Sequence, residues 1–329
     1  MFTELEFQNF RNLKNASWST SSVGAVFLGL NGQGKSNLLE ALYVLASGHS
    51  YRTKKLSVAI NFAEQSFHLK AKDLANNYYQ VSAASWPSNR SEHRFNHRVV
   101  SLSSYAMHLP VSIFTAQDWE FFFGSPASKR DYWDNLLSQL NNTYYTTLSR
   151  YEGVLKQRNR LLKQIREGLA RKSELTAWDQ ELIPLGDLLW QMRQELAENW
   201  RLKISNYYQK LSQNTDLVDL AYKPKRDTLN WGEDLLKRQN KDILLASTTV
   251  GPHRDEWEWL IRGRSAREFA SQGEQRSLIL AAKLLEIQEL ESQFGKPAIL
   301  LLDDVFSELD ENRQLALAEL CRGRQTFLS

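Results

Sequence analysis

The chain has 329 residues and a formal net charge of +3, from 41 Lys and Arg against 38 Asp and Glu. This near balance excludes a histone-like polycation, whereas a local basic face stays compatible with it because steering depends on how charges are distributed. A hydrophobic share of 42% and a charged share of 24% exclude disorder as the main state.

Cysteine content and the first residues bear on the compartment. Cys321 is the single cysteine of the sequence, which excludes an intramolecular disulfide and disfavours a cysteine-based metal site. Residues 1–7 are acidic where a secretory signal would be basic, and no run approaches the ~18 apolar residues of a membrane span. We therefore expect a soluble, cytoplasmic protein.

The first part of the chain is predicted to form short strands and one helix. Segments of alternating polarity bounded by turn residues predict strands, and an unbroken apolar-rich run predicts a helix. The predicted elements are strands at 2–7, 26–28, 66–72, 79–82 and 111–114, and a helix at 38–46. Helical spacing then dominates from about residue 127 to 212. After residue 213 the sequence is again typical of strands and turns, and it predicts a strand at 256–261. A helix at 273–291 and an apolar strand at 298–302 are predicted to follow.

A helical stretch between two strand-rich ends predicts a discontinuous α/β domain with an inserted helical arm. We expect a head at residues 1–125 together with 241–329, and an arm at residues 126–240. Within residues 151–169 the apolar side chains form one stripe, and the opposite face is expected to carry Lys156, Arg158, Arg160, Lys163 and Arg166. This basic face is either a solvated helix surface or a contact with nucleic acid or a protein partner.

A phosphate-binding loop is predicted after the first apolar strand. Residues 29–36, Gly-Leu-Asn-Gly-Gln-Gly-Lys-Ser, match G-x-x-x-x-G-K-[ST] without a mismatch. Its glycines let backbone N–H groups wrap phosphates, Lys35 supplies a cation to the β and γ phosphates, and Ser36 offers a hydroxyl to Mg²⁺. A glycine turn that happens to hold a lysine is the alternative, and the strand–loop–helix context argues against it.

Two carboxylates, Asp303 and Asp304, end the apolar strand at 298–302. Such a strand fits the centre of a parallel sheet, where ligands bind at the carboxyl ends of the strands. Asp303 would hold Mg²⁺ beside the phosphate loop, and Asp304 would orient or deprotonate the attacking water. A strand followed by a plain Asp-Asp turn is the alternative.

The segment Ser271-Gln272-Gly273-Glu274-Gln275-Arg276 opens the helix predicted at 273–291. A Ser-x-Gly sequence at a helix start presents a hydroxyl and unpaired N–H groups to an anion. Because one subunit has no use for two γ-phosphate sites, this segment makes sense if it reaches a nucleotide held by another subunit. The alternative is a plain N-cap serine followed by glycine.

In this order the phosphate loop, S-Q-G-E-Q-R and L-L-D-D-V-F-S-E-L-D resemble the ABC-type ATPase heads of chromosome-maintenance and recombination proteins. Within that group the chain resembles the RecF family of bacterial recombination and gap-repair ATPases. The resemblance covers nearly the whole chain and includes residues 7–13, 48–53, 124–134, 150–162 and the V-G-P-H-R-D sequence at 250–255.

The resemblance implies a P-loop ABC-type head that binds ATP and Mg²⁺ and forms an ATP-dependent homodimer. Each ATP would lie between the phosphate loop of one head and the S-Q-G segment of the other. The dimer would clamp double-stranded or gapped DNA, including single-strand/double-strand junctions, in recombinational repair and replication-fork maintenance. Weak, DNA-stimulated hydrolysis would release it, and the recombination mediator proteins RecO and RecR would be partners.

Carried over by position, the resemblance also assigns roles to residues. The nucleotide would contact Asn31, Gly32, Gly34, Lys35, Ser36, Asn37 and Arg11 of one head, and Ser271 and Gly273 of the other. Mg²⁺ would bind Ser36 and Asp303, while hydrolysis would depend on Asp304, Lys35 and either Gln117 or Asp118. Asp310 matches the dimer-crossing loop. Arg52, Lys54 and Lys55 would line the DNA face, although a solvated loop accounts for them equally well.

Some positions depart from the pattern of related heads. Asp304 stands where most such heads have Glu, which suggests a slow switch, and Lys129-Arg130 replaces a double arginine. Residues 323–329 end where the family continues into a further strand and a γ-phosphate-sensing loop, so we expect a shortened chain with impaired hydrolysis. The alternative function is an ATP-gated module that recruits partners with negligible hydrolysis. A transporter nucleotide subunit is a third possibility, but neither the arm nor V-G-P-H-R-D resembles that group.

Overall fold

The computed structural model describes residues 1–30, 32–87, 89–212, 214–228, 230–306 and 309–329. The chain forms two compact units, a first unit of Met1–Asp118 with Ile279–Ser329 and a second unit of Trp119–Leu278. The predicted head and arm divide the chain at other residues and stay a prediction. Across the described ranges, no helix is both long and apolar enough to cross a membrane.

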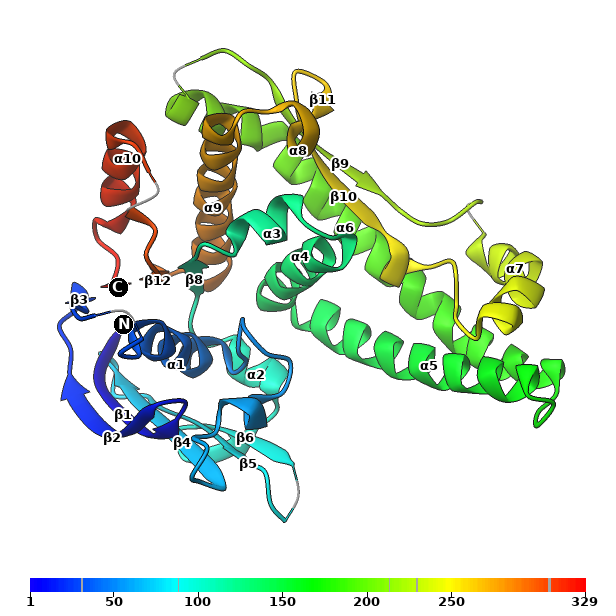
Figure 1. Ribbon diagram of the computed structural model, residues 1–329, viewed down its shortest axis with the longest axis horizontal. Coiled ribbons are helices and arrows are strands. Elements are labelled where there is room, and N and C mark those ends of the chain that lie inside the picture. The colour runs from blue at the N-terminus through cyan, green and yellow to red at the C-terminus, as the bar shows by residue number, and fades with distance from the viewer. Residues whose placement is uncertain (31, 88, 213, 229, 307–308) are drawn as a thin grey trace. The chain divides into compact units, whose positions relative to one another are not determined.

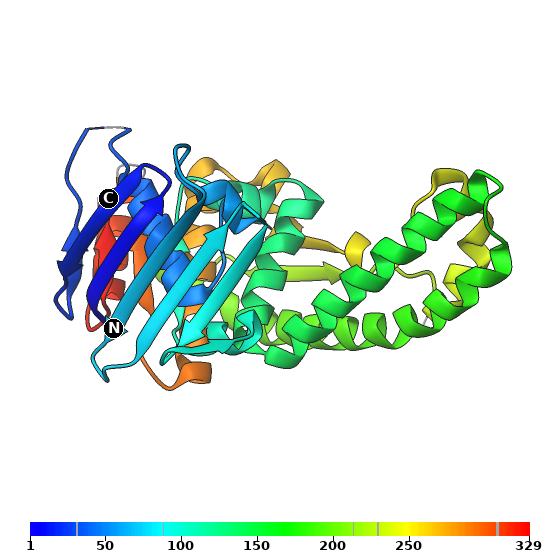
Figure 2. The same ribbon diagram turned by 90° about the horizontal axis from the view of Figure 1, so that it is seen from below.

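An antiparallel six-stranded sheet makes up one layer of the first unit. Its strands run in the order β2 (Leu13–Ser19), β1 (Phe2–Phe10), β4 (Ser66–Asp73), β5 (Tyr78–Ala84), β6 (Arg90–Phe95) and β7 (Arg98–Val100), and Figure 2 shows this sheet in front. Burial alternates along β4 and β5, so every second side chain faces the core.

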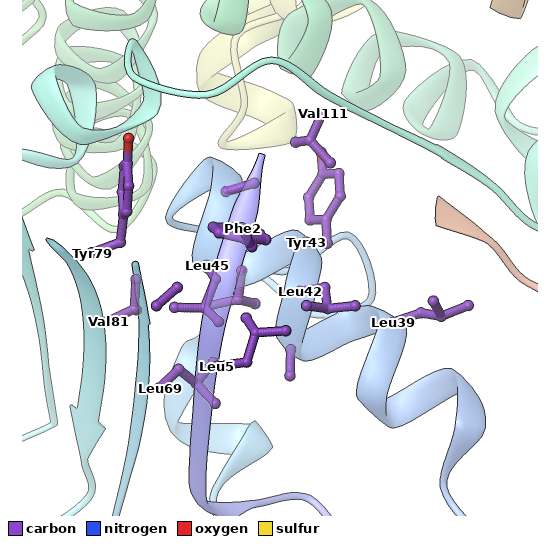
Figure 3. Packing of buried hydrophobic residues seen from close by; sticks show 14 of the residues in the cluster. Phe2, Leu5, Leu39, Leu42, Tyr43, Leu45, Leu69, Tyr79, Val81 and Val111 are labelled. Carbon is purple, nitrogen blue, oxygen red and sulfur yellow. The ribbon is translucent and has the colours of Figure 1, made fainter. Parts of the chain in front are cut away.

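Helix α1 (Lys35–Ser47) covers the buried face of this sheet. Residues 39–47 are all buried, and the helix contacts strands of both sheets of the unit. In Figure 3, Leu5 and Leu69 of the sheet lie beside Leu42 and Leu45 of α1, and these side chains belong to one hydrophobic cluster. The core therefore fixes α1, which begins where the predicted phosphate loop ends.

A parallel four-stranded sheet forms the other layer of the first unit. Its order is β3 (Gly24–Val26), β13 (Thr326–Leu328), β12 (Ile299–Leu302) and β8 (Val111–Phe114). All residues of β8 and β12 are buried, as expected for central parallel strands.

One prediction about this sheet is wrong. The strand expected at 26–28 ends at Val26, and Leu28 is exposed. The strand β13 was not predicted; its residues 326–328 pair with both β12 and β3. A three-residue strand is too short to show a periodic pattern in the sequence.

The first unit also contains three short helices among its described residues. These are η1 (Leu56–Ala59), α2 (Leu102–Ala106) and α10 (Glu311–Cys321). The division between the units falls inside helix α9 (Gln272–Phe294), whose range agrees with the helix predicted at 273–291.

The second unit is mainly helical, with a small antiparallel sheet of order β11-β10-β9. Its elements are α3 (Asp118–Phe123), α4 (Pro126–Leu140), α5 (Asn142–Arg166), η2 (Lys172–Glu174), α6 (Leu175–Ser212), β9 (Val218–Lys223), α7 (Trp231–Leu245), η3 (Pro252–Arg254), β10 (Glu256–Ile261), β11 (Arg264–Ser265) and α8 (Ala266–Phe269). Ser125 caps α4 and Asn141 caps α5, because each side chain accepts backbone N–H bonds of the following turn. The helix α7 was not predicted.

The basic face predicted on α5 is wrong at one position. Arg158 is fully buried and donates from Nε to Asp179 (2.6 Å) and from Nη1 to Asp242 (2.9 Å) and Thr248 (2.7 Å). It lies four residues after the buried Val154, so helical periodicity places it on the apolar stripe. Lys156 and Arg160 are exposed, as expected.

The V-G-P-H-R-D sequence at 250–255 ties several elements of the second unit together. The Asp255 carboxylate accepts hydrogen bonds from Arg193 Nη1 (2.7 Å), Trp190 Nε1 (3.0 Å) and the Tyr222 hydroxyl (2.5 Å). Burial raises the pKa of Asp255, which the Arg193 guanidinium opposes. This segment thus joins α6 and β9 in a buried polar network.

His253, in the same segment, is held between two partners. Its Nε2 lies 3.0 Å from the carbonyl oxygen of Thr248, to which it must donate, so Nδ1 accepts from the Tyr151 hydroxyl at 2.7 Å. Burial lowers the pKa of His253 to about 4. These contacts give His253 a structural role within the second unit.

Replacing Arg158 by Ala should destabilise the second unit by about 3–5 kcal/mol, because Asp242 would be left buried without its cationic partner. Urea unfolding followed by tryptophan fluorescence measures this, since most tryptophans belong to this unit. Arg160→Ala, two residues along the same helix and exposed, is the matched control and should stay within about 0.5 kcal/mol of the parent. Equal effects of the two changes would contradict the buried assignment.

The pKa of His253 predicts part of the pH dependence of stability. Between the unfolded value of about 6.5 and the folded value of about 4, the unfolded chain binds a proton that the folded chain does not. This histidine therefore favours unfolding as pH falls below about 6.5, by about 2 kcal/mol at pH 5. We expect His253→Gln to flatten the loss of unfolding free energy between pH 7 and 5. An unchanged slope would refute the prediction, and His97→Gln, at an exposed position, controls for loss of a histidine.

Candidate nucleotide site

The candidate site lies in the first unit, at the carboxyl ends of the four parallel strands. Leu302 of β12 pairs with Phe114 of β8 and with Leu328 of β13, so these strands end level with one another. Figure 1 shows β8 and β12 side by side. The residues that follow the strands are therefore brought to one edge, which is where ligands bind in such sheets.

The phosphate loop leads from β3 to α1 in a conformation that its glycines allow. Gly32 and Gly34 have φ angles of +81° and +106°, which other residues rarely adopt. Gly34 is the N-cap of α1, and within the described part of the chain no side chain caps it. The first-turn N–H groups are thus available to phosphate oxygens. Asn31, predicted to contact the nucleotide, lies outside the described residues.

Lys35 lies across this loop. Its Nζ donates to the carbonyl oxygens of Gly29 (3.0 Å) and Leu30 (3.3 Å). These bonds hold the ammonium group over the same stretch of backbone that would surround the phosphates. The contact fits the predicted role of Lys35, since a phosphate oxygen could replace either carbonyl.

Ser36 and Asp303, the residues predicted to bind Mg²⁺, are in direct contact. Ser36 Oγ donates to Asp303 Oδ1 at 2.9 Å, and Ser329 Oγ donates to the same oxygen at 2.7 Å. Hydroxyl and carboxylate oxygens suit this hard cation, which usually takes one or two carboxylates together with phosphate oxygens. The Ser36 hydroxyl and the Asp303 carboxylate therefore fit Mg²⁺ that is bound jointly with phosphate oxygens.

Asp304 follows Asp303 in an unusual backbone conformation. Its φ angle is +54°, and its backbone N–H donates to Ser329 Oγ at 3.3 Å. A non-glycine residue in this region is strained, and such residues occur often at functional sites. The exposed position of Asp304 beside the Asp303–Ser36 pair agrees with a role toward a water molecule.

In the loop after β8, Gln117 and Asp118 are the two candidates for the predicted role in hydrolysis, and the structure distinguishes them. Asp118 is buried, accepts the backbone N–H of Thr115 at 3.1 Å and lies 4.0 Å from Lys283 Nζ. Burial raises the pKa of Asp118 to about 6. Gln117 is exposed, and its backbone N–H donates to Thr115 Oγ1 at 3.1 Å. The geometry therefore favours Gln117 as the residue that senses metal and water.

Glu40 of α1 is a buried residue of the site that the sequence analysis missed. It is fully buried and pairs with two predicted site residues, Arg11 (Nη2, 2.8 Å) and Arg52 (Nη1, 3.1 Å). Arg11 Nη1 also donates to the carbonyl oxygen of Val58 at 3.1 Å. The available signal was one acidic residue inside an otherwise apolar helix segment.

Around the phosphate loop, Asn37 and Arg52 belong to one hydrogen-bond network. Arg52 Nη1 donates to Asn37 Oδ1 at 2.8 Å, so Arg52, predicted for the DNA face, also contacts the start of α1. Lys54 and Lys55 are exposed. The DNA role of these three residues stays a prediction.

The S-Q-G segment belongs to the second unit and forms a helix cap. Ser271 Oγ accepts the N–H of Glu274 at 3.2 Å, and the Glu274 carboxylate accepts the N–H of Ser271 at 2.7 Å. This reciprocal pair is a capping box at the start of α9. The cap agrees with the plain N-cap interpretation, and Ser271 is also exposed. The predicted contact of Ser271 and Gly273 with a second copy stays a prediction.

Asp310, predicted for the dimer-crossing loop, is the N-cap of α10. Its side chain accepts the backbone N–H of Arg313 at 3.0 Å and forms an ion pair with the same residue. Residues 307 and 308 of the motif lie outside the described residues. The observed contacts thus give Asp310 a structural role within this chain.

The chain is similar to known proteins over nearly its whole length. The family model described as RecF/RecN/SMC N terminal domain matches residues 1–327. The DNA replication and repair protein RecF of Natranaerobius thermophilus is 34% identical over 349 residues, covering 99% of this chain and 90% of the relative. RecF of Heliobacterium modesticaldum is 34% identical over 337 residues, covering 99% of this chain and 91% of the relative.

Solved structures agree with the sequence matches. A structure described as the recombination mediator protein RecF-ATPrS in the RecFOR pathway superposes with a TM-score of 0.92 at 29% identity, over 100% of this chain and 91% of that one. An Smc head bound to a domain of ScpA gives a TM-score of 0.51 at 17% identity, covers 99% of this chain and 88% of that one, and supports the fold alone. The predicted fold class, an α/β ABC-type ATPase head, is confirmed, and the chain belongs to the RecF family.

Proposed function

We propose that this protein is an ATP-dependent DNA-binding ATPase of recombinational repair and replication-fork maintenance. The observation that carries the proposal is the convergence of the phosphate loop, Asp303, Asp304 and Gln117 on one sheet edge, with Ser36 and Asp303 2.9 Å apart. Solved RecF structures described with ATP and ATPrS support ATP as the nucleotide, and the relatives are named DNA replication and repair proteins.

The residues of the loop would bind the triphosphate and its metal. Backbone N–H groups of the first turn of α1 would hold phosphate oxygens, and the Lys35 ammonium would exchange its carbonyl partners for the β and γ phosphates. Ser36 and Asp303 would hold Mg²⁺, which neutralises phosphate charge when bound.

Hydrolysis would depend on groups at the ends of β12 and β8. Asp304 would accept a hydrogen bond from the attacking water and orient it, and the exposed Gln117 would hold the same water from the neighbouring strand end. Ser271 and Gly273 of a second copy would complete the site at the γ phosphate. ATP binding would thereby drive dimerisation, and hydrolysis would reverse it.

The dimer is proposed to clamp double-stranded DNA, gapped DNA and single-strand/double-strand junctions through backbone contacts. Candidate contacts are Arg52, Lys54 and Lys55 and the exposed basic residues of α5. RecO and RecR are proposed as partners, in agreement with the RecFOR pathway named for the similar structure.

A second candidate is an ATP-gated module that recruits partners with negligible hydrolysis. The short Asp304 side chain, fixed on a left-handed backbone, favours this alternative because it restricts where the carboxylate can reach. Single-turnover hydrolysis with and without DNA separates the two proposals.

Variants of the loop and of the acidic pair should separate binding from hydrolysis. We expect Lys35→Met to abolish ATP binding in calorimetry, because the phosphates lose their cation. Asp304→Asn should retain ATP binding within about twofold while lowering single-turnover hydrolysis by about 10²-fold or more. Lys14→Met, at an exposed position on β2, is the control. Hydrolysis that survives Asp304→Asn unchanged would remove the proposed role of this residue.

Dimerisation directly tests whether ATP lies between the phosphate loop of one copy and the S-Q-G segment of the other. Light scattering should show an ATP-dependent doubling of mass for the parent, and Ser271→Arg should prevent it with nucleotide still bound, because a bulky cation would obstruct the partner's phosphate. Ser125→Arg removes another exposed N-cap serine of the same unit and should still dimerise. If the Ser271→Arg variant dimerises with the same affinity as the parent, the proposed cross-subunit site is wrong.

A further inference from the structure

Glu40 is a charged residue in the apolar interior of α1. Its side chain has no exposure, yet it accepts hydrogen bonds from Arg11 Nε (3.0 Å) and Nη2 (2.8 Å), Arg52 Nη1 (3.1 Å) and Ser50 Oγ (2.6 Å). A carboxylate in such a place is stable only when its charge and lone pairs are compensated. The two arginines and the hydroxyl supply that compensation.

The two arginines come from different segments of the first unit. Arg11 lies in the turn between β1 and β2, where its φ angle is +53°, and Arg52 follows the end of α1. Both bind the same carboxylate, one through two nitrogen atoms, so the position of each guanidinium constrains the other. Ser50 adds a second restraint, because its Oγ accepts the backbone N–H of Arg52 at 3.0 Å.

Further hydrogen bonds link this group to the phosphate loop. Asn12 follows Arg11, and its Nδ2 donates to the carbonyl oxygen of Gln33 at 3.2 Å. Asn37 Nδ2 donates to Asn12 Oδ1 at 2.9 Å, and Asn37 Oδ1 accepts from Arg52 at 2.8 Å. The backbone of the phosphate loop is therefore linked to both arginines: to Arg11 through its chain neighbour Asn12, and to Arg52 through Asn12 and Asn37.

We infer that Glu40 is a positioning residue of the nucleotide site, which holds Arg11 and Arg52 as a fixed pair against the phosphate loop. The inference rests on the proposed nucleotide binding. Glu40 acts through the arginines and does not itself touch the nucleotide. It lies four residues after Ser36 on α1, so one helix carries both the residue that binds phosphate and metal and the residue that fixes the flanking cations.

The change in ATP affinity of the variant Glu40→Gln distinguishes a positioning role from a purely electrostatic one. It removes a negative charge close to the phosphates, so Coulomb attraction alone predicts tighter binding of the anionic nucleotide. Positioning predicts weaker binding, because the amide NH₂ group of Gln would face arginine N–H groups, which cannot accept its hydrogen bonds. The two effects are opposite in direction.

The experiment is ATP titration by calorimetry with the full chain and Mg²⁺. We expect Glu40→Gln to weaken ATP binding about tenfold. The matched control is Glu291→Gln, because Glu291 binds Arg324 through two nitrogen atoms (2.6 and 2.7 Å) in the same unit and has no contact with the loop in the structure as described. Both variants should lower the melting temperature, whereas the control should bind ATP within about twofold of the parent.

Each outcome decides between the claims. Unchanged or tighter ATP binding by Glu40→Gln, with a parent that binds ATP, overturns the positioning role and leaves the proposed function intact. Equal weakening in the Glu291 control assigns the effect to general destabilisation and also overturns it. A parent that does not bind ATP removes both proposals. Should Glu40→Gln not fold, Ser50→Ala removes one donor to Glu40 and is expected to weaken binding about threefold in the same direction.

Discussion

Parallel pairing of β3, β13, β12 and β8 is the constraint on which the candidate site depends. The strands β8 and β12 are entirely buried, so their N–H and C=O groups must pair with neighbouring strands, and this pairing fixes the relative register of the sheet. The register in turn decides which residues meet at the carboxyl edge. A slip of one residue would turn the side chains after β12 to the other face and separate Asp303 from Ser36, residues 267 positions apart in the chain.

Much of this edge could be predicted from the sequence, because the informative signals are local. The glycine pattern before Lys35 specifies a loop, the apolar run before Asp303 specifies a central strand, and ends of parallel strands meet. Distant partners of charged residues leave no comparable local signal. Glu40 was read simply as part of a helix, and its two arginines lie in separate segments. Arg158 was assigned to the basic face of its helix although helical spacing places it on the apolar stripe, because its partners Asp179 and Asp242 follow much later in the chain.

Several residues with a predicted functional role also have a structural one in the single chain. Ser271 completes a capping box, Asp310 caps α10, and Arg52 contacts Glu40 and Asn37. Such a residue must exchange or share its present partners when it meets a ligand. Part of its interaction energy with that ligand then offsets the loss of contacts inside the chain, and the remainder appears as affinity.

The loop after β8 has a consequence for how such chains diverge. Thr115 and Asp118 are buried and bonded to each other, while Ala116 and Gln117 between them are exposed. The closed turn therefore tolerates many side chains at position 116 but no change in the number of residues it spans. Inserting or deleting a residue would draw Gln117 into the interior or expel Asp118 from it. Across related chains, the length of this loop should vary far less than the residue at position 116.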